Sequence, residues 1–121
     1  MLVLGISLHA QYRYQELTAD TVKGAQTKYI TSSVKADLYG IATFDYTAKG
    51  FGTNDTATVT LQGKNQGTSW IDISTVKHGG VTAKDYQLKD SPSSFLNYRL
   101  KILGKATDTV RVYQPLFIYK R

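Results

Sequence analysis

The sequence predicts an all-β protein, a single antiparallel β-sandwich of jelly-roll or immunoglobulin-like type over residues 1–121. Three observations predict this fold class. Almost every hydrophobic pattern has a period of two, threonine and nine tyrosines enrich the chain in strand formers, and polar turns recur at intervals of roughly 8–12 residues. A helix is expected at most as one turn after Thr18.

The first expected element is an N-terminal strand or extended arm. Leu2, Leu4, Ile6 and Leu8 alternate with other residues, which is the period of a strand, and the stretch lacks the positive start of a leader peptide. No run approaches the 18 apolar residues of a transmembrane helix, so no membrane contact is expected. Residues 10–18 alternate in the same way and predict a half-exposed strand.

The middle of the chain predicts a strand, a turn and a hairpin. Residues 38–47 form the strand, with Gly40 marking a bulge, and residues 49–55 form the turn. Residues 56–63 and 69–73 then alternate on either side of a polar connection, which is typical of a β-hairpin.

The last third predicts a short strand over residues 86–88 and a second hairpin, formed by residues 95–103 and 109–113. Pro115 cannot donate a hydrogen bond to a neighbouring strand, so its strand is expected to lie at an edge or to bend there. The residues expected in the core are Val59, Leu61, Trp70, Ile73, Tyr98, Leu100 and Ile102.

Composition excludes several classes of site. The chain has no cysteine, which removes disulfides, thiolate zinc sites, iron–sulfur clusters and cysteine nucleophiles. Its 15 Lys and Arg against 9 Asp and Glu give a net charge of +6. These cations are scattered singly, which indicates a mildly acidic partner and disfavours nucleic acid, since a nucleic-acid site needs clustered positive charge.

No catalytic or metal-binding motif is present. The two histidines are far apart, and His78, beside Gly79 and Gly80, is expected in a loop. No spacing brings two acids such as Asp45 and Asp72 together, as a glycosidase or calcium site would require. We therefore expect no enzymatic activity, no cofactor and no metal.

A resemblance to a known family rests on the segment 58–73. Its strand, Gln62-Gly63, a Gly67-Thr68 turn, Trp70 and an acidic residue resemble a hairpin of small β-sandwich virion proteins of tailed bacteriophages, the auxiliary or decoration capsid proteins. The segment 98–113 is similar to the closing hairpin of that group. The first hairpin is also similar to that of discoidin-type carbohydrate-binding sandwiches.

The resemblance implies a virion protein that cements the lattice of a major capsid protein, in many copies of a symmetric assembly. Two alternatives stay open: a carbohydrate-binding sandwich of a tail fibre or secreted adhesin, with Trp70 and tyrosines as sugar contacts, and a tail or neck adaptor. The location is the virion, or the outside of the cell for the adhesin. The expected partner contacts are Leu2, Leu4, Tyr12, Arg13, Tyr14, Phe117, Tyr119 and Arg121.

Overall fold

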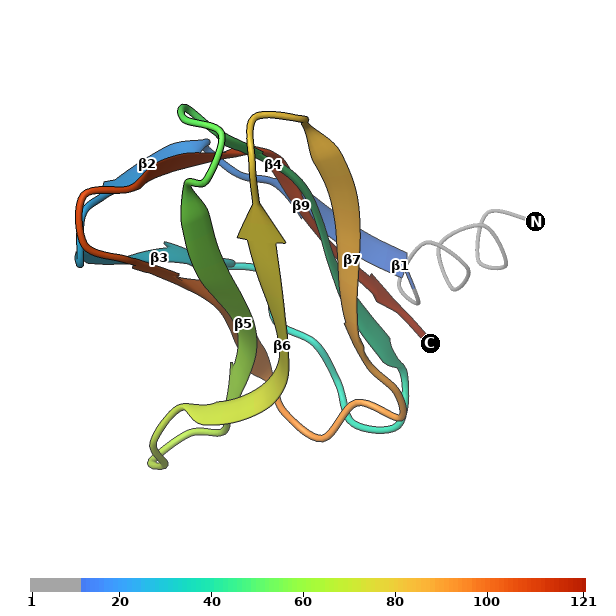
Figure 1. The fold of residues 1–121 in the computed structure, drawn as a ribbon. Coiled ribbons are helices and arrows are strands. Elements are labelled where there is room, and N and C mark those ends of the chain that lie inside the picture. The colour runs from blue at the N-terminus through green and yellow to red at the C-terminus, as the bar shows by residue number, and fades with distance from the viewer. Residues whose placement is uncertain (1–11) are drawn as a thin grey trace.

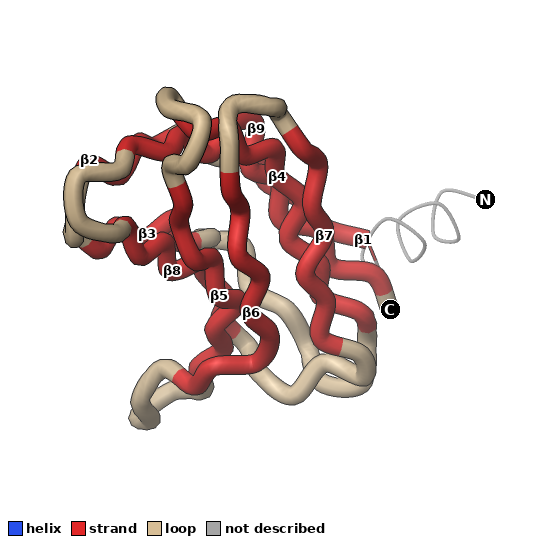
Figure 2. Tube along the Cα trace, in the orientation of Figure 1, coloured by secondary structure: helices blue, strands red, loops and turns tan. Residues whose placement is uncertain are grey.

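A computed structural model describes residues 12–121 as two antiparallel β-sheets packed face to face, with no helix among those residues (Figures 1 and 2). The period-two patterns thus give the predicted β-sandwich. The expected arm at Leu2 and Leu4 lies outside the described residues.

The sheet that we call sheet A has the strand order β1-β9-β4-β7, and β2 pairs with the same strand, β9, as β1 does. Its strands are β1 (Tyr12–Glu16), β2 (Asp20–Lys23), β4 (Ile41–Gly50), β7 (Lys84–Asp90) and β9 (Thr109–Lys120).

The other sheet, sheet B, has the order β3-β8-β5-β6. Its strands are β3 (Thr27–Thr31), β5 (Thr56–Lys64), β6 (Ile71–Gly79) and β8 (Asn97–Gly104). The predicted hairpin at 56–73 exists as β5 and β6, with a register shift between Leu61 and Gln62.

Aromatic rings fill the space between the sheets. The Phe117 ring of sheet A stacks on the Tyr98 ring of sheet B, with centroids 5.6 Å apart, and packs on Phe44 at 5.3 Å. Rings of this size remove a large apolar area from water, which is the main favourable contribution to such a core. Of the residues expected here, Ile73 is partly buried, and those fully buried are Val59, Leu61, Tyr98, Leu100 and Ile102.

Trp70 was expected in the core, and that expectation is wrong. It precedes β6, is only partly buried, and stacks on the guanidinium of Arg99, a side chain on the outer face of sheet B. The register shift between Leu61 and Gln62 changes the side on which even-numbered residues lie. Val76 and His78 face the core, whereas Asp72, bonded to Gln62, and Trp70 face outward.

The second predicted hairpin is also wrong. β8 pairs with β3 and β5, whereas β9 pairs with β1, β2 and β4, so the turn at 105–108 carries the chain from sheet B to sheet A. In that turn the Asp108 carboxylate accepts hydrogen bonds from the amide and hydroxyl of Thr56, at the start of β5. The two strands match in pattern because both are half buried, but each fills a different layer.

The strand with Pro115 is not an edge strand. β9 lies between β4 on one side and β1 and β2 on the other. Phe117 and Tyr119, expected as partner contacts, lie on its core-facing side and are fully buried. Gly40 does not mark a bulge; it precedes β4, and a Cβ there would collide with the Tyr119 ring.

His78, expected in a loop, is fully buried in β6. Its Nε2 lies 3.0 Å from the Gly80 carbonyl oxygen and its Nδ1 lies 2.8 Å from the Tyr86 hydroxyl of β7. A carbonyl only accepts, so Nε2 carries the proton and Nδ1 accepts from Tyr86. This side chain links the β6 edge of sheet B to the β7 edge of sheet A.

Candidate functional site

Sheet A is interrupted across its middle by a β-bulge. Its register shifts between Asp45 and Thr47 of β4, opposite Leu116 and Tyr113 of β9. The extra residues of β9 include Gln114, which has a φ of 49°, and Pro115. A bulge of this kind bends its strand and redirects nearby side chains, and Pro115 is tolerated there because a bulge leaves a residue unpaired.

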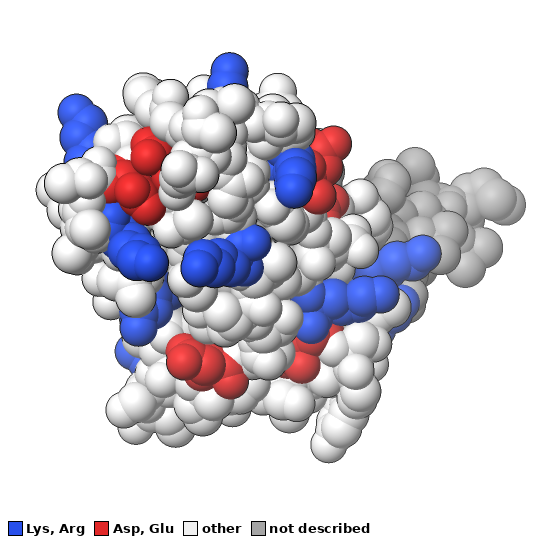
Figure 3. All heavy atoms as spheres, in the orientation of Figure 1, with Lys and Arg blue, Asp and Glu red and all other residues white. Residues whose placement is uncertain are grey.

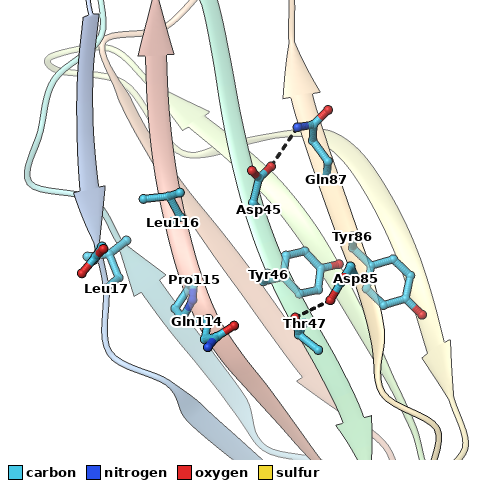
Figure 4. Close-up of a pocket in the computed structure, with 11 residues that line it drawn as sticks. Leu17, Asp45, Tyr46, Thr47, Asp85, Tyr86, Gln87, Gln114, Pro115 and Leu116 are labelled. Atoms are coloured by element: carbon cyan, nitrogen blue, oxygen red, sulfur yellow. Dashed lines mark hydrogen bonds between the residues drawn. The ribbon is translucent and has the colours of Figure 1, made fainter.

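The edge of the sheet is interrupted at the same level. β1 ends at Glu16 and β2 begins at Asp20, and the Leu17 amide donates to the Pro115 carbonyl at 2.8 Å. The two interruptions leave a hollow of about 920 Å³ that runs across β1, β9, β4 and β7 (Figure 4).

Two cross-strand pairs line the hollow. Gln87 of β7 donates from Nε2 to Oδ1 of Asp45 in β4 at 3.0 Å, and the Thr47 hydroxyl donates to Oδ1 of Asp85 at 2.6 Å (Figure 4). Both pairs stand directly opposite each other in the register of β4 and β7. Each bond uses one carboxylate oxygen, so the second oxygen is held in a fixed position as an acceptor.

The rest of the lining is mixed in character. Leu17, Pro115 and Leu116 supply an apolar side, and Glu16 and Gln114 add further polar groups. Among the described residues that line the hollow there are three carboxylates and no Lys or Arg. The hollow is therefore acidic in a chain whose net charge is +6. On the face shown in Figure 3, Lys and Arg are spread among acidic residues.

Two exposed tyrosines continue the hollow along β1. Tyr12 and Tyr14 lie with Glu16 on the outer side of the strand, are 48% and 60% exposed, and have ring centroids 6.0 Å apart. Glu16 stands opposite Leu116, which stands opposite Asp45, so the tyrosines and the hollow share one face. We call this face, the tyrosine pair together with the hollow, the groove.

The other predicted contacts lie elsewhere. Arg13 points to the opposite side of β1, where its guanidinium lies 5.5 Å from the Tyr119 ring and 2.9 Å from a carboxylate oxygen of Asp37. Arg121 is exposed after the end of β9. Of the predicted contact residues within 12–121, only Tyr12 and Tyr14 thus belong to the groove.

Behind the groove, Tyr46 of β4 stacks on Tyr86 of β7 with centroids 5.3 Å apart. The hydroxyl of Tyr46 is buried and has no hydrogen-bond partner among the described residues. Burial, with the neighbouring Tyr86 as a smaller cause, raises the pKa of Tyr46 far above its ordinary value, and burial also raises the pKa of Tyr86. Both side chains are therefore neutral at pH 7, and both also line the hollow, Tyr46 as a buried and Tyr86 as a partly buried side chain.

Sequence reasoning missed the paired polar residues of the hollow. Asp45 and Thr47 are two residues apart and therefore lie on one side of their strand, as Asp85 and Gln87 do on theirs. This spacing is visible in the sequence. What joins them is the pairing of strands about 40 residues apart. Over residues 12–121, no group of three His, Cys, Asp or Glu side chains could hold a metal ion.

No family model and no curated protein sequence matches the chain. Solved structures do. A CBM4 structure matches with a TM-score of 0.55 at 8% identity, covering 86% of this chain and 77% of its own. The Clostridium thermocellum xylanase 10B CBM22-1-GH10 modules match at 0.59 and 12%, covering 92% and 26%. Tailspike protein 4 of bacteriophage CBA120 matches at 0.56 and 11%, covering 89% and 19%.

These matches establish the fold. It is the β-sandwich that carbohydrate-binding modules also have. In the two larger proteins the matching part is about a fifth to a quarter of the chain. None of the described residues forms a helix long and apolar enough to cross a membrane.

Proposed function

We propose that the chain is a non-catalytic carbohydrate-binding β-sandwich whose groove on the outer face of sheet A holds a neutral glycan. One observation carries this proposal: the exposed Tyr12 and Tyr14 rings lie on the same sheet face as a hollow lined by the fixed pairs Asp45–Gln87 and Thr47–Asp85.

The two parts of the groove match the two sides of a sugar ring. A pyranose has an apolar C–H face, which packs on an aromatic ring, and a rim of hydroxyls, which need directed donors and acceptors. Carboxylate and amide groups that are already hydrogen-bonded to each other are fixed before the ligand arrives, so binding costs little side-chain entropy. An uncharged glycan suits this groove because the carboxylates would repel an anionic one.

The comparisons support the same function. The similar structures include carbohydrate-binding modules of families 16 and 29, a CBM61 in complex with β-1,4-galactotriose, and the CBM22-1-GH10 modules complexed with xylohexaose. These ligands are short neutral oligosaccharides. The capsid-decoration role has less support, since two of its expected contacts, Phe117 and Tyr119, are buried in the core. The tailspike match fits a sandwich that is part of a larger phage or secreted protein.

The test is a binding screen of the full chain against neutral polysaccharides (xylan, β-1,4-galactan, mixed-linkage β-glucan) by affinity electrophoresis, followed by calorimetry with the matching oligosaccharide. We expect Tyr14→Ala and Asp45→Ala each to weaken binding by about tenfold or more, because each removes one class of contact. Phe51→Ala is the control, since Phe51 is an aromatic residue of similar exposure (63%) outside the groove. No binding to any neutral glycan, or equal losses in the control, would contradict the proposal.

A further inference from the structure

The outer face of sheet B carries a second cluster of aromatic and charged side chains. The Arg99 guanidinium of β8 lies 3.9 Å from the ring centroid of Tyr29 in β3 and 4.2 Å from that of Trp70. Tyr29 is 47% exposed, so part of its ring remains open to a ligand. We call Tyr29, Arg99 and Trp70 the arginine stack.

Arg99 is held in one orientation. Its Nε donates to Oε1 of Gln62 at 2.7 Å, and Gln62 Nε2 in turn donates to Oδ1 of Asp72 at 2.7 Å. Over residues 12–121 the hydrogen bonds of the Arg99 side chain involve Nε only, so the two terminal Nη groups have no protein acceptor. A guanidinium fixed by stacking and by its Nε presents these two groups as a preset pair of donors.

The surroundings favour an anion. Lys64 Nζ lies 5.7 Å from the Trp70 centroid, and Lys101 stands two residues along β8 on the same side as Arg99. The acid of the cluster, Asp72, already accepts from Gln62. Partial burial lowers the pKa of Arg99, but an arginine remains charged at neutral pH. This face is therefore cationic, whereas the groove on the other sheet is acidic.

We propose that the arginine stack is a second binding site, specific for the carboxylates of an acidic polysaccharide. A planar carboxylate accepts two parallel hydrogen bonds from the Nη groups, while the ring that bears it packs against the exposed part of Tyr29. A uronic acid unites these two features in one residue. The proposal depends on the groove only in that both ligands are polysaccharides; its residues lie on the other sheet.

The test compares polygalacturonate with the same polymer fully methyl-esterified, by affinity electrophoresis and calorimetry on the full chain. The two polymers share their sugar rings and differ in charge. We expect binding of the acid form, weak or no binding of the ester, and a loss of about tenfold or more in Arg99→Lys, which keeps the charge but not the paired donors. Affinity is also expected to fall as salt is added.

The control variant is Arg111→Lys. Arg111 is also an arginine beside an aromatic ring, 5.2 Å from Tyr113, but it lies on β9 and donates to Thr21. Its binding is expected to stay within about twofold of the unchanged chain. Thermal unfolding of both variants checks that they fold. Gln62→Ala frees Arg99 Nε without removing the cation, so its effect on binding of polygalacturonate tests the same site a second time.

Three results would overturn the proposal: equal binding of the acid and ester forms, equal losses in both arginine variants, or binding of single-stranded DNA in place of polygalacturonate with the same dependence on Arg99. Neutral glycans are measured on the same samples. If the unchanged chain binds polygalacturonate but no neutral glycan, the groove proposal fails and the arginine stack stands. If it binds a neutral glycan but not polygalacturonate, the arginine stack fails and the groove stands.

Discussion

The two outer faces of this sandwich differ in charge, shape and construction. The groove of sheet A is a hollow at a bulge, lined by carboxylates and amides that bond to one another across β4 and β7. The face of sheet B has a guanidinium between two aromatic rings. The net charge of the chain, +6, has the same sign as the charge on the face of sheet B and the opposite sign to the charge in the groove of sheet A.

The difference shows that strand register, rather than composition, determines what each face can bind. On sheet A the register places each acid opposite an amide or a hydroxyl, so a hydrogen bond holds each carboxylate in place and leaves its second oxygen as an acceptor. On sheet B the register places Arg99 opposite both Thr31 and Gln62, and the amide of Gln62 fixes its orientation. A fixed polar group loses less freedom on binding than a mobile one, so each proposed site would bind its ligand at a lower entropic cost.

Breaking the link between the sheets is expected to have the largest effect on stability. His78→Leu removes the donor to Gly80 and leaves the Tyr86 hydroxyl without its acceptor, so we expect a loss of about 2–3 kcal/mol in the free energy of unfolding. Urea denaturation measures it. Lys77→Ala, at the exposed neighbouring position, should change stability by less than about 0.5 kcal/mol. Equal effects of the two substitutions would show that the hydrogen bonds of His78 do not hold the sheets together.

One buried tyrosine from each sheet sharpens the comparison. In sheet B the Tyr98 hydroxyl donates to Asp90 at 2.8 Å, so Tyr98→Phe is expected to cost about 1–2 kcal/mol. In sheet A the buried Tyr46 hydroxyl has no partner among the described residues, so Tyr46→Phe should be neutral or stabilising by up to about 1 kcal/mol. Chemical denaturation of both variants at pH 7 decides this, and a destabilised Tyr46→Phe would reveal a hydrogen bond that the structure does not contain.

The same tyrosine predicts a dependence on pH. Because burial raises the pKa of Tyr46 above its unfolded value near 10, the folded state holds the proton more tightly. Its contribution to stability is complete below pH 10 and is lost as pH rises above it. Tyr46→Phe should therefore lose less stability than the unchanged chain between pH 10 and 11.5, by about 1 kcal/mol. Melting curves test this, with Tyr39→Phe, at an 82% exposed site, as the control that should follow the unchanged chain.

The smallest effect is expected at the surface ion pair of sheet A. Arg13 and Asp37 are 2.9 Å apart with side chains 36% and 44% exposed, so solvent screens the pair and Asp37→Asn should cost less than about 1 kcal/mol. The loss should shrink further in 1 M salt because exposed charges are screened. A cost above 2 kcal/mol would mean that this pair positions β1, and with it the tyrosines of the groove.

The local hydrophobic pattern of the sequence predicts the fold better than it predicts the candidate site. The alternation in residues 56–73 predicts both strands of a true hairpin, because neighbouring strands in sequence often pair. The same reasoning fails for 95–113, since its turn crosses between layers and nothing local distinguishes the two cases.

The groove depends on pairings that no local pattern contains. Tyr12 and Tyr14 could be singled out because aromatic residues on an exposed strand are visible in the sequence. Their acidic neighbours could not, because Asp45 meets Gln87 only after β7 has paired with β4. The prediction for Trp70 failed for a related reason. Large aromatic residues are usually buried in a core, but the Trp70 ring is instead partly covered by the guanidinium of Arg99, from a different strand.

The position of Trp70 gives the molecule its own optical label. It is the chain's one tryptophan, and it stands on the outer face of sheet B beside the cations of Arg99 and Lys64. The groove, by contrast, contains tyrosines, which are weak emitters. Fluorescence excited at the tryptophan band is therefore expected to follow events on the outer face of sheet B without any attached dye, and to be insensitive to events in the groove of sheet A.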